Sequence, residues 1–154
     1  MALSKKKNNE SKNMHFSRED QKKILSSSSP FIVKEAYSSI RTNLLFSQKG
    51  DECPVFIVTS PTANNGKSIN SVNMAVSFAQ MGKKTLLIDA DMRNPTVHRL
   101  FSIPVKNGLS EILAGLTDNI TVSKTDIENL SVLTAGKIPP NPSELLSSER
   151  TDKL

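Results

Sequence analysis

Three adjacent residues, Gly66-Lys67-Ser68, have the types and order suited to binding nucleotide phosphates. In the pattern G-x-x-x-x-G-K-[ST], backbone N–H groups wrap the phosphates, the lysine reaches the terminal ones and the hydroxyl binds Mg²⁺. Pro61 occupies the first glycine position here, so three of the four fixed positions match. Because the triplet lies between an apolar run and a helix-like segment, it predicts a phosphate-binding turn.

The other positions of this turn are filled by Ala63, Asn64, Asn65 and Ile69. Asparagine is the non-glycine residue that best tolerates left-handed backbone, at a cost of about 1–2 kcal/mol. We therefore expect residues 63–69 to contact a nucleotide, with the asparagine side chains crowding the phosphate path.

Two carboxylates, Asp89 and Asp91, follow the apolar run Leu86 to Ile88. Open α/β sheets bind ligands at the carboxyl ends of their strands, and residues i and i+2 of a strand point the same way. One carboxylate could hold Mg²⁺ while the other accepts a substrate proton. The plain alternative is a solvated Asp-x-Asp pair, which the company of Lys67 and Ser68 disfavours.

The elements around these residues read as a strand, a helix and a second strand. Val55 to Val58 is apolar without alternation, which is typical of a strand buried on both faces. Residues 67–81 predict a helix that ends near Gly82, with apolar residues Val72, Ala75, Val76 and Ala79 on one face. Residues 86–88 predict a second buried strand, giving a βαβ unit with a right-handed crossover.

A further helix is predicted upstream, with Ser29 as N-cap, Pro30 at the first helical position and an end near Gly50. A turn over residues 51–54 follows it. Three-and-four spacing places one apolar stripe on this helix, formed by Ile32, Val33, Ala36, Tyr37, Ile40, Leu44 and Leu45.

Shorter elements follow Pro95. We expect a helical turn over 96–101, a helix over 109–114, a third strand over 130–133, and a helix that starts at Pro142 and runs to the chain end. The predicted fold is α/β, a P-loop NTPase-like parallel sheet flanked by helices, incomplete at its C-terminal side.

Composition limits the function classes. The chain has 154 residues and a net charge of +5, and residues 1–23 carry seven basic against three acidic side chains. The basic excess therefore describes a Ser-rich, disordered tail over 1–29 rather than a nucleic-acid-binding domain. Cys53 is the only cysteine, so no disulfide framework is expected. No apolar run approaches the roughly twenty residues of a membrane helix, and no secretory signal is visible.

Three segments resemble the bacterial tyrosine kinases, the P-loop family that controls capsular and exopolysaccharide assembly. Leu86 to Pro95 is similar to that family's Walker A′ segment, Pro139 to Leu146 resembles a second stretch, and Glu35 to Asn43 resembles its N-terminal oligomerisation helix. They occur in family order and span nearly all of residues 30–154, interpreted as a partial kinase domain.

The resemblance implies an ATP- and Mg²⁺-dependent protein-tyrosine kinase. Lys67 would contact the β- and γ-phosphates, Ser68 would ligate Mg²⁺, Asp89 would assist the metal and the attacking hydroxyl, and Asp91 would support the same constellation. It also implies docking to a transmembrane polysaccharide co-polymerase or adaptor, a homo-oligomeric ring, and a cytoplasmic location at the inner face of the membrane through that partner.

The sequence departs from the family pattern in places that bear on activity. Ser38 replaces an arginine of the motif Glu35-x-x-Arg-x-x-Arg41, and Ile69 replaces a threonine. The chain is expected to be truncated before the Walker B strand, and Tyr37 is its only tyrosine. Two alternatives stay open. One is a catalytically inactive module that binds the membrane adaptor. The other is a partition-type ATPase, although the extra lysine of that class near Thr62 is missing.

Overall fold

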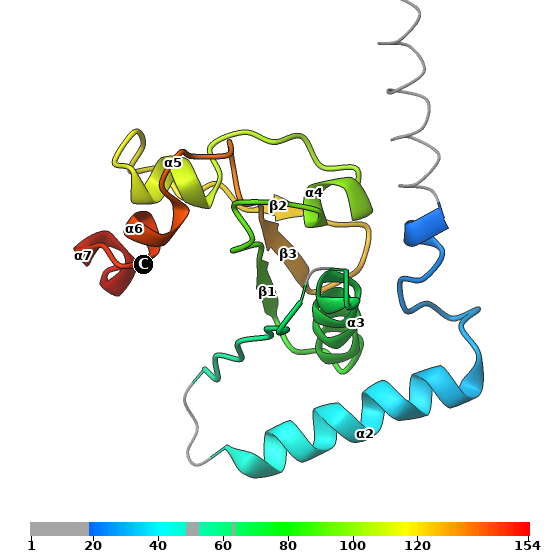
Figure 1. Ribbon diagram of the computed structural model, residues 1–154. Helices are drawn as coiled ribbons and strands as arrows, with labels where there is room; N and C mark the ends of the chain where they lie inside the picture. Colours follow the sequence, from blue (N-terminus) through cyan, green and yellow to red (C-terminus); the bar gives the residue numbers. More distant parts are fainter. Residues whose placement is uncertain (1–18, 49–52, 63) are drawn as a thin grey trace, which may run out of the picture. The chain divides into compact units, whose positions relative to one another are not determined.

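The computed structural model describes residues 19–48, 53–62 and 64–154. The chain forms two compact units. Of the described residues, one unit comprises those within 24–87 and 124–132, and the other comprises those within 19–23, 88–123 and 133–154. The first holds the two longest helices and the second holds a cluster of short ones (Figure 1).

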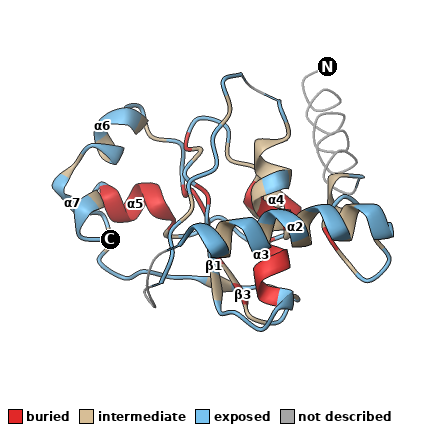
Figure 2. Cartoon of the chain, turned by 90° about the horizontal axis from the view of Figure 1, so that it is seen from below, coloured by how far each residue is buried: buried red, intermediate tan, exposed pale blue. Residues whose placement is uncertain are grey.

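Helix α3, Lys67–Gln80, is the buried centre of the first unit. Its apolar side chains face inward, and Val72 and Val76 are completely buried (Figure 2). The helix stops where the sequence predicted, because Gly82 follows it with a φ of +82°, a left-handed conformation that glycine adopts without strain. The predicted helix over 67–81 is confirmed.

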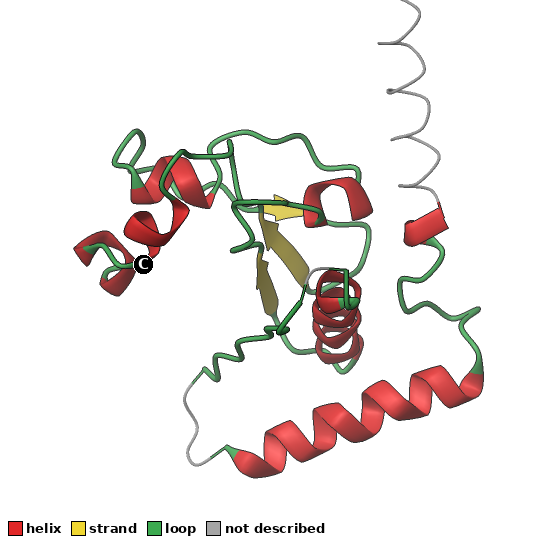
Figure 3. Ribbon diagram, in the orientation of Figure 1, coloured by secondary structure: helices red, strands yellow, loops and turns green. Residues whose placement is uncertain are grey.

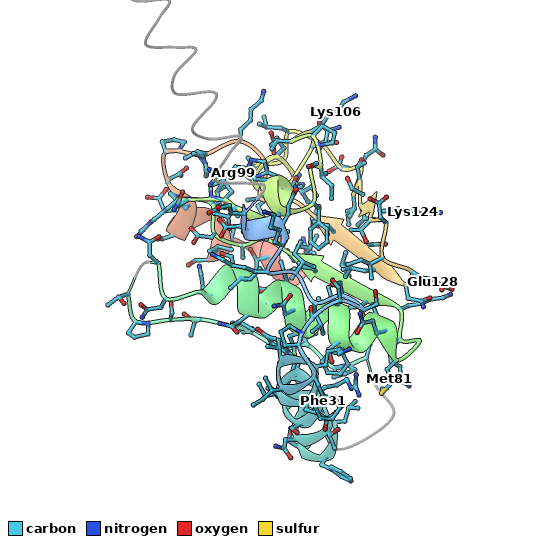
Figure 4. The ribbon with its side chains drawn as sticks, turned by 90° about the vertical axis from the view of Figure 1, so that its right-hand side faces the viewer. Phe31, Met81, Arg99, Lys106, Lys124 and Glu128 are labelled. Atoms are coloured by element: carbon cyan, nitrogen blue, oxygen red, sulfur yellow. The ribbon has the colours of Figure 1, made fainter. Side chains whose placement is uncertain are left out.

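Helix α2, Phe31–Ser47, is also confirmed, but it begins one residue later than predicted. Pro30 has a ψ of 144°, so it lies before the helix as the N-cap residue. No residue of α2 is buried, and Phe31 and Ile32 are each 76% exposed (Figures 2 and 4). The apolar stripe therefore does not become a core face, because α2 attaches to α3 through polar side chains described below.

Three short strands form the sheet: β1, Thr85–Ile88; β2, Ser123–Lys124; and β3, Leu130–Leu133. Their order is β1-β3-β2. The N–H of Thr85 bonds the carbonyl of Asn129 at 2.8 Å and the N–H of Asp89 bonds that of Leu133 at 2.9 Å, so β1 and β3 run parallel. Strands β1 and β3 were predicted. Strand β2 was not, because two residues are too few to show an alternation of apolar and polar side chains.

The strand predicted over Val55 to Val58 is wrong, and with it the βαβ unit. The segment lies outside the sheet (Figure 3), with Val55 83% and Ile57 90% exposed. Phe56 stacks on Phe78 of α3 with ring centroids 5.6 Å apart, which fastens the segment to the helix.

The second strand, β1, was predicted to be buried on both faces, and this also differs. Leu87 is buried while Leu86 and Ile88 are 49% and 42% exposed. Burial on both faces requires covering elements on both sides. Successive side chains of a strand point to opposite faces of the sheet, and the burial of Leu87 alone shows that only its face is covered at β1.

The second unit has its own apolar core. Among its described elements are the short helices α4, Val97–Leu100; α5, Leu109–Leu113; α6, Pro142–Leu146; and α7, Glu149–Asp152. The core side chains are Met92, Leu109, Ile112, Leu113, Leu133 and Ala135, with Leu145 packed against them. Predicted helices at 96–101 and 109–114 are confirmed. The single terminal helix is instead two, because Ser148 is extended (ψ 154°) and separates α6 from α7.

Residues 19–29 lie within the region predicted as tail. Leu25 is 4% exposed and its N–H bonds the Asn73 side chain at 2.8 Å, so packed structure begins before Pro30. Residues 1–18, to which most of the tail prediction applies, lie outside the described residues, as do 51–52 of the predicted turn. Across 19–48, 53–62 and 64–154, no helix is both long and apolar enough to cross a membrane.

Candidate functional site

The predicted phosphate turn is a loop that enters α3 through left-handed backbone. Asn64 has a φ of +61° and Gly66 a φ of +73°, and Gly66 is the N-cap residue of the helix. The tolerance of asparagine for left-handed backbone is therefore used at Asn64. Asn64 and Asn65 are exposed, while Lys67 and Ser68 are partly buried. Ala63 lies outside the described residues.

The first turn of α3 supplies backbone donors. The first N–H bonded within the helix is that of Asn70, which donates to the Gly66 carbonyl at 2.9 Å. The N–H groups of Lys67, Ser68 and Ile69 precede it, and no side chain caps the helix. The first turn also contains no acidic residue. Fourteen residues of helix place partial positive charge at this end, so the arrangement suits a phosphate.

Asn70 and Tyr37 brace this loop, and the sequence analysis assigned neither to the site. The Asn70 amide nitrogen donates to the Gly66 carbonyl at 3.0 Å, and its Oδ1 accepts the Tyr37 hydroxyl at 2.8 Å. The Tyr37 oxygen accepts a further bond from Asn73 Nδ2 at 3.2 Å. A readable signal existed: Asn70, Asn73 and Ser77 follow three-and-four spacing, which draws a polar line along one side of α3.

Arg41 makes the second polar bridge between the two helices. Its Nη1 donates to the Ser77 carbonyl at 2.8 Å and to the Ser77 hydroxyl at 3.0 Å, and its Nη2 donates to Ser38 Oγ at 3.0 Å. Its Nε is buried and has no partner among the described residues. The serine at position 38 thus accepts a bond from Arg41 within the same helix.

Asp89 lies in the second unit, directly after β1, and is 5% exposed. Its Oδ1 accepts the N–H of Asp91 at 3.1 Å, and its Oδ2 accepts those of Thr96 and Val97 at 3.2 and 3.1 Å. The carboxylate therefore ties the turn over 89–97 together and orients the start of α4.

Burial raises the pKa of Asp89 above its ordinary value of 3.8, against the three backbone donors, which lower it. A carboxylate offers about four lone-pair positions. Three are used, so one position on Oδ1 is left for a water or a metal ion. Oxygen donors are what Mg²⁺ prefers. Asp89 is therefore suited to ligate Mg²⁺ through one carboxylate oxygen, Oδ1.

Asp91 does not pair with Asp89 in the way that strand alternation predicted. Strand β1 ends at Ile88, so the two aspartates are no longer at alternate positions of a strand. Asp91 Oδ1 instead accepts the N–H of Asn94 at 3.0 Å. Both carboxylates thus stabilise the turn locally, a use the spacing alone did not reveal.

His98 of α4 was not considered from sequence. Burial lowers its pKa below 6.5, the neighbouring Arg99 lowers it further, and the charge of Asp89 opposes both. Its Nδ1 is buried and has no partner among the described residues. The loop over 64–69 and the Asp89–Asp91 turn belong to different units.

The similar proteins and the solved structure reported below are named as tyrosine kinases. The family model described as AAA domain matches residues 62–150. The chain is 45% identical over 119 residues to putative tyrosine-protein kinase CapB of Staphylococcus aureus, covering 77% of this chain and 52% of that protein. It is 41% identical over 136 residues to tyrosine-protein kinase YwqD of Bacillus subtilis, covering 87% and 57%.

A solved structure, that of the BceF tyrosine kinase domain, superposes with a TM-score of 0.73 at 41% identity, covering 84% of this chain and 52% of that one. The α/β fold class predicted from sequence is confirmed at this level. The chain spans about half the length of the curated relatives CapB and YwqD.

Proposed function

The chain belongs to the P-loop family of bacterial tyrosine kinases, and on this premise we propose that it binds MgATP and serves protein-tyrosine phosphorylation in capsular or exopolysaccharide synthesis. The observation that carries the proposal is the loop over 64–69. Left-handed backbone at Asn64 and Gly66 leads into a long helix whose first N–H groups precede its internal bonding.

Each residue then has a defined task. The N–H groups of residues 67–69 bind phosphate oxygens, and the Lys67 ammonium neutralises the terminal phosphates. Ser68 and Asp89 are the residues that would hold Mg²⁺, which when bound would neutralise further charge on the phosphates. Asp91 accepts the proton of the attacking tyrosine hydroxyl. Phosphoryl transfer depends mainly on such positioning and charge neutralisation.

The family membership also supports a wider proposal about location and partners. The protein would act at the inner face of the membrane by docking to a transmembrane polysaccharide co-polymerase or adaptor, and would join a homo-oligomeric ring. Helix α2 carries two of the three residues of the family's oligomerisation motif, Glu35 and Arg41, with Ser38 at the third position.

A second candidate is an interaction module that binds the adaptor without catalysis. Arg41 bears on this candidate through the ring: its guanidinium is bonded to Ser38 and Ser77 of its own chain, and those donors are then not used for a contact with a neighbouring protomer. This candidate predicts adaptor binding without phosphotyrosine, whereas the kinase predicts phosphotyrosine that depends on MgATP. Incubation with MgATP and the adaptor, followed by phosphotyrosine detection, separates the two.

Nucleotide binding is tested with MgATP titrated into the wild-type protein and the Lys67→Ala variant. We expect saturable binding by the wild type and none by Lys67→Ala. Lys83→Ala is the matched control, because Lys83 is an exposed lysine beyond the far end of α3. Equal binding by wild type and Lys67→Ala would contradict the proposed function.

A further inference from the structure

A chain of two hydrogen bonds connects α2 to the phosphate loop. The Tyr37 hydroxyl donates to Asn70 Oδ1 at 2.8 Å, and the other end of the same amide donates to the Gly66 carbonyl at 3.0 Å. All three residues lie in the same compact unit. The phenol oxygen is thus one side chain away from the left-handed glycine of the loop.

We propose that Tyr37 is a positioning residue for the phosphate loop, so that nucleotide affinity depends on the docking of α2 through this hydroxyl. The proposal rests on the proposed function, since it assigns a residue that tunes the same site. It adds a position, Tyr37, that lies 29 residues before Gly66 in the sequence.

The physical reason lies in the planarity of the peptide bond between Gly66 and Lys67. The carbonyl of Gly66 and the N–H of Lys67 belong to one rigid trans plane and point in opposite directions. Two donors from Asn70, its backbone N–H at 2.9 Å and its side chain at 3.0 Å, hold that carbonyl. They therefore also aim the Lys67 N–H, which is one of the proposed phosphate donors.

Tyr37 keeps the Asn70 amide in the orientation that this requires. Asn70 is an exposed residue, so water would compete for its side chain if its oxygen were free to turn. The phenol in turn is fixed by Asn73 Nδ2 at 3.2 Å. Asn73 is 3% exposed and its Oδ1 holds the N–H of Leu25 at 2.8 Å. The brace is therefore anchored in the interior of the unit.

The Arg41 bridge supplies an internal control. It joins the same two helices one turn further along α2, but its partner on α3 is Ser77, ten residues beyond Lys67. Breaking it loosens the helix pair without changing the bonds to Gly66. A general effect of α2 docking and a specific effect of Tyr37 can thus be separated.

The first experiment measures the affinity of the full chain for a fluorescent ADP analogue with Mg²⁺. Tyr37→Phe should weaken binding roughly three- to ten-fold, the range expected for one lost hydrogen bond that orients a donor. Arg41→Met should stay within about two-fold of wild type by the same scale. Adding Tyr37→Phe to Asn70→Ala should have no further effect, because both act on one relay.

The second experiment measures amide hydrogen exchange without nucleotide. Tyr37→Phe should speed exchange of the backbone N–H of Asn70, which donates to the Gly66 carbonyl. Arg41→Met should leave that exchange rate unchanged. Unchanged exchange and affinity in Tyr37→Phe, or equal changes in Arg41→Met, would overturn the proposal. If the wild type binds no nucleotide, the proposed function fails. The exchange rate of the Asn70 backbone N–H still decides whether Tyr37 positions the loop.

Discussion

The phosphate loop and the Asp89–Asp91 turn resemble each other in sequence, as short polar groups beside apolar runs, but their structures use polar groups in opposite ways. In the loop, the first N–H groups of α3 precede the internal bonding of the helix, and the asparagines are exposed. In the turn, Asp89 is 5% exposed and accepts three backbone N–H groups. In the proposed function the loop binds a ligand with its N–H groups, whereas the carboxylate oxygens of the turn accept bonds from its own backbone.

Because of this difference, we expect substitutions in the loop and in the turn to change different properties of the protein. Changes in the loop should alter ligand binding with little effect on folding. Changes in the turn should alter folding first, because removing an acceptor leaves buried donors without a partner.

The largest effect should come from Asp89→Ala. Three backbone N–H groups lose their acceptor in a buried turn, so we expect a loss of about 3 kcal/mol in the free energy of unfolding. Urea denaturation measures it. Asp91→Ala is the control, and should lose about 1 kcal/mol because its carboxylate is more exposed. Equal losses in both variants would remove the distinction drawn for Asp89.

Gly66→Ala should come next. A Cβ at Gly66 adds left-handed strain of about 1–2 kcal/mol and would lie 3.3 Å from Asn70 Nδ2. We expect lost nucleotide binding together with this modest destabilisation. Gly82→Ala is matched in backbone, with a φ of +82° and nothing within 4 Å of the added Cβ. It should show similar destabilisation with normal binding; a binding defect there would show that the Gly66 result reports folding alone.

A smaller effect is expected for Asn64→Gly. Glycine relieves the left-handed strain at φ +61°, by at most about 1 kcal/mol, and removes a side chain from the phosphate path. Nucleotide affinity should rise roughly two- to three-fold, a few tenths of a kcal/mol. Competition binding against the wild type checks this. Weaker binding would mean that the asparagine side chain contacts the ligand instead of crowding it.

The smallest effect is a pH dependence of stability. Because the folded-state pKa of His98 is lowered below 6.5, its protonation favours the unfolded chain, so its contribution to stability is lost as pH falls through 6.5. The raised pKa of Asp89 acts in the opposite direction, and stability from that group recovers as pH falls toward 3.8. Thermal unfolding at pH 7.5 and 5.5 should show a decline that His98→Gln reduces; an unchanged decline would contradict this assignment.

Much of the fold could be predicted because local signals decided it. Helix α3 has an apolar face and a terminal glycine, α2 forms where three-and-four spacing placed it, and α5 forms between Gly108 and Gly115. Val55 to Val58 shows the limit. A continuous apolar run indicates a strand only if neighbouring strands pair with it, and no pattern within the run says whether they do.

The site was predictable where a motif fixes the backbone, and not where contacts are made between distant residues. Gly66, Lys67 and Ser68 were identified from their order alone. The bond from Tyr37 to Asn70 joins positions 33 residues apart, and no local rule pairs them. The aspartates were found by position, but the backbone N–H groups that their carboxylates accept depend on where β1 ends.

The most direct test of the central claim, that the loop takes phosphates and Asp89 takes the metal, is a calorimetric titration of ATP in Mg²⁺ and in EDTA. We predict that Mg²⁺ tightens ATP binding in the wild type, and that Asp89→Asn, confirmed as folded by circular dichroism, still binds ATP but loses the Mg²⁺ effect. Binding that is equally tight with and without Mg²⁺ in the wild type, or a full Mg²⁺ effect in Asp89→Asn, would contradict the account.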